Sequence, residues 1–373
     1  MQIVEITDYE SFLRLESEWN GLLRGHSDEK PFYMHQWFRI WWDSFGTKKK
    51  LYVLVARQEQ KVLAIAPLMI SRGSYMGFPM RIIEFMANHQ SPKIDFIFPP
   101  DNTAGAEKIL DHLWRRNNWD LLKLEDILES SPVIDLIEKK CGDARLLWGK
   151  RMIRLSPYIS IQSDWNSFLA TRSRKFRKNM RNRQRRLGES GDFRIEEHSQ
   201  IDDLDGLLAQ IQNVTRKSWQ GGRGSSAFST KESLNFYVNL ARWANQERFL
   251  VLWLLILNSI PIAYEYHLRS GQTEFGLKAE YDERFKQGSP GGVLDQFIVE
   301  SLFDRGLKTY DLLGYDDPYK MCWTESVHRH VRYYILKNRA YARMPFWLDF
   351  RLRDYLRRFG ILVRLKKMVL SNT

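Results

Sequence analysis

Cysteine is scarce in this chain, and its scarcity excludes two kinds of protein. Only Cys141 and Cys322 occur among the 373 residues, far apart and outside any CxxC motif. A disulfide framework or a cysteine-based zinc site needs more cysteines at closer spacing. We therefore expect a protein of a reducing compartment, the cytoplasm.

Long apolar runs and several common catalytic motifs are also missing. The longest apolar run has nine residues, Phe249–Leu257, whereas a membrane-spanning helix needs about 20. The first residues, MQIVEITDYE, carry acids and no apolar core, so we expect no signal peptide. The chain has no GxSxG, no Walker lysine and no GxGxxG, which disfavours hydrolase and nucleotide chemistry. His328 and His330 share one face of a predicted strand without a third ligand, so no metal site is expected.

Acidic residues are absent from one strongly basic stretch. Between Arg172 and Arg186 there are nine Lys or Arg residues, which supply three quarters of the net charge of +12. The apolar residues Leu169, Phe176, Met180 and Leu187 are spaced 7, 4 and 7, which predicts one helix with a narrow apolar seam. Like charges at this density favour a bound polyanion over a merely solvated face. The residues chosen for such binding are Arg172, Lys175, Arg177, Lys178 and Arg181.

The elements that are present follow one order twice. The first block predicts a hairpin (Leu51–Arg57 and Lys61–Ile70), a strand (Lys93–Phe98), a helix (Ala104–Arg116) and a strand (Asp120–Leu124). The second predicts strands at Phe249–Leu257, Ile260–Leu268 and Thr273–Tyr281, a helix at Val293–Arg305 and a strand at Lys308–Leu313. This repeat predicts tandem domains, residues 1–150 and 151–340, followed by a basic amphipathic tail at 341–373.

A glycine-rich turn, Gly288–Gly292, separates a strand from a helix in the second block. The free N–H groups of a helix N-terminus attract phosphate, and Pro290 suits the first turn because it needs no partner for an N–H. A tight connection without a ligand is the alternative reading of the same turn.

Short motifs along residues 30–335 carry a family resemblance. They are Trp37, Trp41-Trp42, Phe45-Gly46, Pro67-Leu68, Ser91-Pro92 with Asp95-Phe96, SRKFRKNMRNRQRRL, Pro261-Ile262-Ala263, Tyr281-Asp282, Ser289-Pro290-Gly291, Asp311 with Gly314, and Tyr319-Lys320 with Trp323. In order and spacing they resemble the CelD-type acetyltransferase family. That family is a branch of the GNAT superfamily related to the Fem-type aminoacyl transferases of cell-wall synthesis.

The resemblance implies a fold class and an activity. The fold is α/β (α+β), with tandem GNAT-like domains, each a mostly antiparallel mixed sheet flanked by helices. The activity is transfer of an acetyl-like group from acyl-CoA to an amine or hydroxyl of a small or lipid-linked cell-envelope or exopolysaccharide precursor. Gly288, Ser289, Gly291 and Gly292 would hold the pyrophosphate of acyl-CoA. The first domain has PPDNTAG in place of this turn, so we expect it to be degenerate.

One departure leaves the donor open. The usual GNAT turn is Q/R-x-x-G-x-G/A, whereas Gln287 is followed by Gly-Ser-Pro-Gly-Gly, a spacing shifted by one residue. An aminoacyl-tRNA is the alternative donor, and a non-catalytic module that binds membranes or nucleic acid is the third interpretation. The basic helix would accordingly meet the CoA 3′-phosphate, a diphosphate, tRNA or anionic lipid. The tail (Phe346–Leu370) predicts either peripheral contact with the inner membrane face or packing against protein.

Acyl transfer needs a base, an acid and charge to orient the substrates. Glu280 and Asp282, at the end of a strand beside the turn, are the candidate bases, with a solvated strand end as the alternative for each. Tyr319 is the candidate acid, and Lys320 is expected to orient a phosphate or carboxylate of the acceptor. Asp311 would brace the loop Gly314–Pro318. Asp95 would reach a cleft between the domains.

Overall fold

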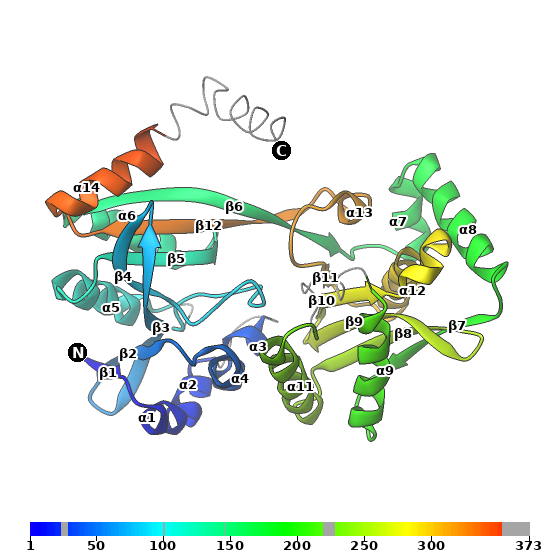
Figure 1. Ribbon diagram of the computed structural model, residues 1–373, viewed down its shortest axis with the longest axis horizontal. Coiled ribbons are helices and arrows are strands. Elements are labelled where there is room, and N and C mark those ends of the chain that lie inside the picture. Colours follow the sequence, from blue (N-terminus) through cyan, green and yellow to red (C-terminus); the bar gives the residue numbers. More distant parts are fainter. Residues whose placement is uncertain (24–28, 100, 145, 219–227, 353–373) are drawn as a thin grey trace.

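The computed structural model describes residues 1–23, 29–99, 101–144, 146–218 and 228–352. Two halves lie side by side, each built on a sheet with helices on its faces (Figure 1). Within these residues no helix is both long and apolar enough to cross a membrane. Of the predicted tail, α14 (Ala340–Trp347) and the π-helical turn η2 (Leu348–Leu352) are described. The remaining tail residues lie outside the described part of the chain.

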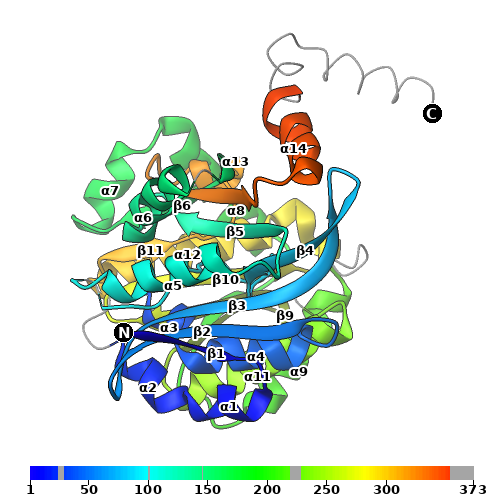
Figure 2. The same ribbon diagram turned by 90° about the vertical axis from the view of Figure 1, so that its left-hand side faces the viewer.

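The first half contains the predicted hairpin and helix. Its elements are β1 (Gln2–Ile6), α1 (Tyr9–Arg14), α2 (Glu16–Gly21), α3 (Lys30–Tyr33), α4 (His35–Phe45), β2 (Lys50–Gln58), β3 (Lys61–Tyr75), β4 (Phe78–Phe85), α5 (Ala104–Arg115), β5 (Leu121–Leu128), α6 (Pro132–Asp143) and β6 (Leu147–Ser160). The prediction of a hairpin is confirmed, because β2 and β3 pair antiparallel across a short turn. The tip of the β3–β4 hairpin reaches up beside α14 (Figure 2), where the Tyr75 hydroxyl donates to Asp349 at 2.8 Å.

The predicted strand at Lys93–Phe98 is wrong. The segment is irregular, and its one ladder contact is an isolated bridge between Ile97 and Ile65. Pro92 and Pro99 flank it and cannot donate to a ladder. Its side chains are also drawn to other partners. The Lys93 ammonium, 1% exposed, lies 2.6 Å from Glu29 and 3.0 Å from Asp311 of the second half.

The second half repeats the order of the first. Its elements are α7 (Trp165–Thr171), α8 (Arg174–Gly188), β7 (Phe193–His198), α9 (Leu204–Arg216), α11 (Lys231–Gln246), β8 (Leu250–Leu257), β9 (Ile260–Ser270), β10 (Thr273–Tyr281), the 3₁₀ turn η1 (Glu283–Gly288), α12 (Pro290–Asp304), β11 (Thr309–Asp311), α13 (Pro318–Met321) and β12 (Val327–Leu336). The single predicted basic helix is two helices, because Ser173 caps α8 and places Leu169 on α7. Met180 and Leu187 of the predicted seam are buried.

The apolar run of β8 is explained by helices on both faces of its sheet. Leu252 and Leu254 belong to a core shared with α9 and α11, whereas Val251 and Leu255 belong to a core shared with α12 and α8. Successive side chains of a strand point to opposite faces. A strand covered on both faces therefore reads as a continuous apolar run.

The twelve strands within the described residues form one sheet, in the order β1-β2-β3-β4-β5-β12-β6-β11-β10-β9-β8-β7. The halves are joined by two strands. β12, late in the chain, inserts between β5 and β6 of the first half. β6 pairs with β12 through Leu147–Pro157 and then with β11 of the second half through Tyr158–Ser160. The predicted boundary at residue 150 falls within β6, so backbone hydrogen bonds cross between the halves on both sides of it.

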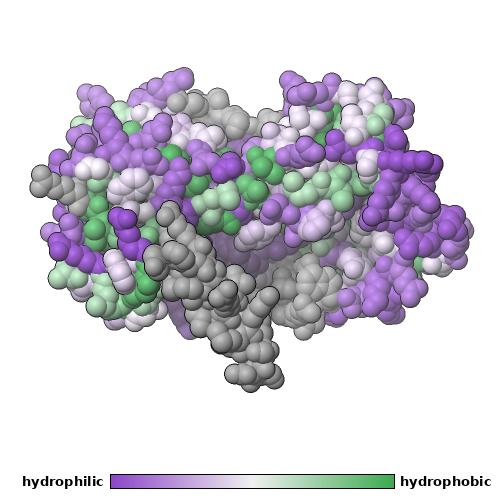
Figure 3. Space-filling model, turned by 90° about the horizontal axis from the view of Figure 1, so that it is seen from above, coloured by the Kyte–Doolittle hydropathy of each residue, from purple (hydrophilic) through white to green (hydrophobic). Residues whose placement is uncertain are grey.

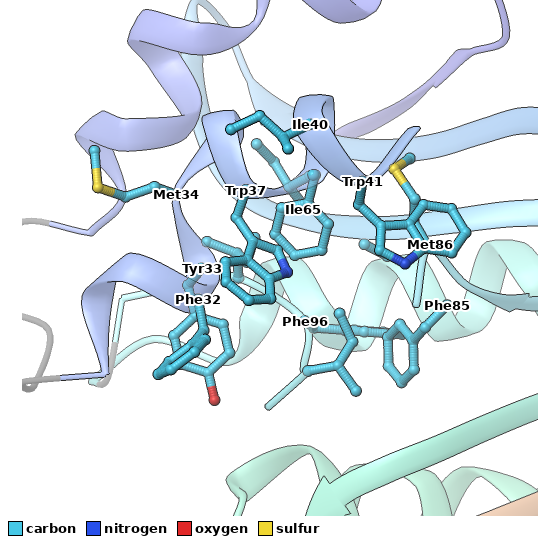
Figure 4. Packing of buried hydrophobic residues seen from close by; sticks show 14 of the residues in the cluster. Phe32, Tyr33, Met34, Trp37, Ile40, Trp41, Ile65, Phe85, Met86 and Phe96 are labelled. Carbon is cyan, nitrogen blue, oxygen red and sulfur yellow. The ribbon is translucent and has the colours of Figure 1, made fainter. Parts of the chain in front are cut away.

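An aromatic core also spans the junction. Trp37 and Trp41 point from α4 toward Phe32, Phe96 and Phe85 (Figure 4). Phe32 meets Phe275 of β10 edge to face at 5.0 Å between ring centroids, and Trp37 meets Phe236 of α11 at 5.5 Å. Burial of each such side chain contributes about 1.5–3 kcal/mol. The two halves are therefore one packed body, and the space between them has fixed walls.

Candidate active site

The chain turns sharply before α12. Asp282 caps η1 by accepting the Arg284 N–H at 3.1 Å, and Ser289 adopts a left-handed conformation with φ 53° and ψ 53°. Such a conformation costs a non-glycine residue about 1–3 kcal/mol and persists only when its surroundings hold it. No side chain caps the first N–H groups of α12. These groups therefore remain available to a ligand.

A cavity of about 600 Å³ opens at this helix N-terminus. Ser289, Gly291 and Gly292 form one wall, whereas Gly288 packs toward Leu187 of α8. Three cations line the cavity: Lys175 and Arg183 of α8, and Lys286 of η1. Phe176, Tyr264, Tyr281 and Trp323 provide apolar surface. The size lies within the range of about 300–1,000 Å³ typical of small-molecule sites. An apolar cavity ringed by cations at a helix N-terminus suits a phosphorylated ligand with an apolar arm.

A second cavity, of about 390 Å³, lies where β10 and β11 separate. The two strands pair only over Thr273–Phe275 and Thr309–Asp311, and a bulge at Leu277 then shifts the register of β10 against β9. A bulge leaves one residue without ladder partners. Residues of the first half close the cavity from the other side: Gln90, Ser91, Pro92, Asp126 and Arg154. Glu265, Ala279, Asp295 and Tyr319 line both cavities and form the wall between them.

Buried cations face this second cavity. Arg154 is fixed by Asp126 at 2.6 Å and by the carbonyls of Gly314 at 3.0 Å and Pro92 at 2.5 Å. The Lys320 ammonium donates to the Leu313 carbonyl at 2.8 Å, and burial lowers its pKa. Burial also lowers the pKa of Lys278, whose ammonium has no hydrogen-bonding or ion-pair partner within the described residues. Such groups attract an anion into the cavity.

A cluster of buried titratable side chains lies behind the wall between the cavities. His267 on β9 contacts Glu265 through Nε2 at 2.8 Å and Glu274 through Nδ1 at 2.7 Å. Glu274 also accepts from Trp253 at 2.9 Å and from Arg269. The sequence analysis missed this cluster. The sequence contains one local sign of this cluster: Glu265 and His267 occupy alternate, inward positions of an otherwise apolar strand.

The predicted catalytic residues are only partly brought together. Glu280 lines the first cavity, where the Ser218 hydroxyl donates to it at 3.0 Å. Tyr319, half exposed, lies between the cavities, and Lys320 lines the second.

Two of the predicted acids lie elsewhere. Asp282 is fully buried and held by Arg284 at 2.6 Å, and it lines neither cavity. Asp95 also lines neither cavity. It accepts the Phe96 N–H at 2.7 Å, and burial raises its pKa to about 7.

The basic residues divide by position. Lys175 lines the first cavity, and Arg183, which was not chosen from the sequence, lies beside it. Arg172 donates to the Trp323 carbonyl at 2.8 Å, and so positions a ring that lines the cavity. Arg177, Lys178 and Arg181 do not line it. Hydrophilic residues cover the right-hand end of the molecule in Figure 3, where α7 and α8 lie.

The histidine pair on β12 has structural partners. The His328 ring stacks on Tyr158 at 4.3 Å between centroids. His330 is buried beside Arg154, and burial lowers its pKa to about 3. Among the described residues, no three His, Cys, Asp or Glu side chains gather as metal ligands would.

Comparison with known proteins supports the assignment of the fold. No curated protein matches the sequence. A sequence model of the acetyltransferase (GNAT) domain matches residues 174–321, from the start of α8 to the end of α13. FemX has a similar structure, with a TM-score of 0.55 at 10% identity over 94% of this chain and all of that one.

L-PGS from Bacillus licheniformis gives a TM-score of 0.55 at 10% identity, over 93% of this chain and 98% of that one. A conserved protein of unknown function from Bacteroides thetaiotaomicron gives 0.53 at 9% identity, over 90% and 100%. At such identities the likeness concerns the fold alone. The predicted fold class is confirmed: the chain has tandem GNAT-like halves, and residues 174–321 match the GNAT acetyltransferase domain.

Proposed function

We propose that this chain moves an acyl group from acyl-CoA to an amine or hydroxyl of a cell-envelope or exopolysaccharide precursor. The observation that carries the proposal is the cavity at the N-terminus of α12, which shares a wall that includes Tyr319 with the cavity between β10 and β11. A phosphorylated donor would lie against the free amides of α12 with Lys175, Arg183 and Lys286 around it. Its acyl end would reach the wall formed by Glu265 and Asp295.

The acceptor would enter from the second cavity, between the halves. Arg154, Lys278 and Lys320 favour an acceptor that carries phosphate or carboxylate groups. The Leu277 bulge leaves backbone groups beside the reacting carbonyl, and N–H groups placed there stabilise the charge that develops in acyl transfer. Tyr319 is the proposed acid, and Glu280 supports the donor side of the site.

Thermal unfolding in the presence of acetyl-CoA tests the donor. At a concentration of about 100 times Kd, a ligand of the folded state adds about 2.7 kcal/mol to its stability. We expect stabilisation by acetyl-CoA and by CoA, which share the pyrophosphate. Unchanged unfolding with both ligands would contradict an acyl-CoA donor.

A second candidate is transfer from an aminoacyl-tRNA. It is favoured by the exposed basic residues of α8 that do not line the cavity, among them Lys178 and Arg181, and by the likeness to FemX over nearly the whole chain. The diagnostic observation is binding of charged tRNA whose affinity falls steeply with salt, as expected when phosphates are neutralised. If neither ligand binds and anionic vesicles do, the non-catalytic interpretation replaces both.

A further inference from the structure

Two carboxyl groups lie in the wall between the cavities. Glu265 comes from β9 and Asp295 from α12, and both line both cavities. Glu265 is 3% exposed, and its Oε2 accepts from His267 at 2.8 Å and from the Tyr310 hydroxyl at 3.3 Å. Its Oε1 is buried and accepts no hydrogen bond from the described residues. A proton on Asp295, which lines the same wall, would supply the missing donor to this oxygen.

The electrostatic surroundings of Asp295 indicate that the two carboxyl groups share a single proton. Burial and the neighbouring Glu265 charge raise the pKa of Asp295 well above its usual range. Two close carboxylates cannot both ionise in a poorly solvated site. The pair therefore holds one proton at neutral pH and retains one basic oxygen toward the cavities.

Two further buried groups, His267 and Glu274, lie behind the pair and influence its charge. Burial lowers the pKa of His267, but the hydrogen bonds to Glu265 and Glu274 outweigh burial and raise it to about 9. The ring is thus an imidazolium with a carboxylate on each nitrogen. Glu274 is anchored in turn by Trp253 and Arg269. This arrangement resists rotation of the Glu265 side chain.

A contribution to folding stability does not explain this row of buried titratable groups. Buried ion pairs are often no more stabilising than apolar residues of similar volume. This row of buried groups ends at Glu265, in the wall between the two cavities. A proton must move at this place during the proposed acyl transfer. Perturbed titratable groups that converge on a cavity are typical of functional sites.

We propose that the Glu265–Asp295 pair is the proton store of acyl transfer, with His267 and Glu274 as positioning residues. This inference rests on the proposed function. As the acceptor nitrogen or oxygen bonds to the acyl carbon, its proton moves to an oxygen of the pair. The carbon–sulfur bond of the thioester breaks, Tyr319 gives its hydroxyl proton to the leaving sulfur to form the free thiol, and the pair returns one proton to Tyr319. The pair then holds one proton again, so the step is balanced.

Other charged or titratable groups surround the pair and belong in any pH analysis. They are Tyr310 on β11, Asp317, Tyr319 and Lys320 at α13, Lys278 on β10, and Lys175 and Arg183 on α8. Burial raises the pKa of Tyr310 and of Tyr319, so both remain neutral donors around the pair.

Infrared spectroscopy of the intact chain tests the shared proton without any substrate. The wild type is expected to show the carbonyl band of a protonated carboxyl at neutral pH. Asp295→Asn should lose the part of this band that Asp295 contributes and keep the part from Asp95, whose pKa burial raises to about 7. Asp304→Asn, at an exposed acid on the same helix, should keep the whole band. Glu274→Gln should shift the pH at which the band disappears, which a purely structural role would not do. A wild type without the band, or a band unchanged in Asp295→Asn, overturns the proposal.

Turnover tests its role in catalysis, with acetyl-CoA as donor and water as the acceptor probe. Release of free thiol should fall by about 10²–10⁴-fold in Asp295→Asn, the usual effect of losing acid–base catalysis. Thermal stabilisation by acetyl-CoA should persist in that variant. If acetyl-CoA stabilises the protein but Asp295→Asn releases thiol at the wild-type rate, the proton store is wrong and the proposed function stands. If acetyl-CoA does not stabilise the wild type, the proposed function fails and the role in catalysis fails with it.

Discussion

The helices α5 and α12 hold the same place in the two halves, yet their N-termini differ. Both follow an antiparallel strand set and precede a strand parallel to its last member. At α5, Gly105 is buried, and a Cβ there would lie 2.7 Å from the Ala64 side chain. At α12, Gly291 and Gly292 line a cavity, and a Cβ at residue 292 would meet the end of the Arg183 side chain.

This difference shows how one architecture serves two purposes. In the first half, a small residue lets the helix close directly on β3. In the second half, small residues keep helix amides open, and α8 covers them at a distance. The comparison therefore favours the second half as the place of the proposed donor binding.

The largest expected effect concerns what the halves share. Trp37→Ala removes a fully buried ring that packs on Phe236 of the other half. Truncation of a buried Trp costs about 3–5 kcal/mol. Denaturant unfolding should show this loss in a single transition. Trp347→Ala, at a half-exposed ring, should change stability by less than about 0.5 kcal/mol. Two separate transitions would mean that the halves fold independently.

A matched pair of glycine variants tests the comparison itself. Gly105→Val should destabilise the fold by about 1–3 kcal/mol through overpacking, and leave acetyl-CoA binding intact. Gly292→Val should alter stability less, because the Arg183 side chain can move aside. It should nevertheless abolish the stabilisation by acetyl-CoA, since the new side chain fills the cavity wall. Thermal unfolding with and without acetyl-CoA measures both effects. Loss of ligand stabilisation in Gly105→Val alone would reverse the assignment.

Charge around the cavity gives a smaller effect. Arg183→Gln should weaken acetyl-CoA binding by about tenfold, because a hydrogen bond to a charged group contributes about 1.5–3 kcal/mol. Arg185→Gln is the control, since Arg185 is 67% exposed and pairs with Glu189. Titration calorimetry should separate the two variants. Equal losses would indicate a general effect of positive charge instead of a defined contact.

A separate effect is on the pH dependence of folding stability, where buried histidines of the two halves act in opposite directions. Burial lowers the pKa of His267, but hydrogen bonds to two carboxylates raise it to about 9, above its unfolded value of 6.5. Its contribution is full below pH 6.5 and is lost as pH rises through about 9. Burial lowers the pKa of His35 in the first half to about 4, so its contribution is full above pH 6.5 and is lost as pH falls toward 4.

Variants of the two histidines separate these contributions. In melting curves across pH, His267→Gln should flatten the alkaline decline of Tm and leave the acidic decline unchanged. His35→Gln should do the opposite. An unchanged alkaline decline in His267→Gln would show that the imidazolium is absent.

Local patterns allowed much of the fold to be predicted. The β2–β3 hairpin, α5, β8 to β10 and α12 follow from periodicity and turn residues that act within a few positions. The insertion of β12 between β5 and β6 could not be predicted, because the sequence of a strand does not specify which distant strand it pairs with. The segment at Lys93–Phe98 failed for a similar reason. Its Lys93 ammonium is buried by Glu29 and Asp311, partners that are distant in sequence.

The candidate site was predicted less completely than the fold. The turn at Ser289 and the residues Tyr319 and Lys320 were identified from their motifs, and each of them lines at least one of two neighbouring cavities. The cluster of Glu265, His267, Glu274 and Asp295 was not identified. Its members lie on two strands and a helix, and only the folded chain brings them within hydrogen-bonding distance.

Hydrogen exchange with and without acetyl-CoA tests the central claim most directly. If the donor binds at the N-terminus of α12, exchange of the backbone amides at residues 291 and 292 should slow when acetyl-CoA is added. The matching amides at the start of α5, residues 104–106, should exchange at an unchanged rate. Protection at α5 instead, or no protection at either helix with saturating acetyl-CoA, would contradict the account.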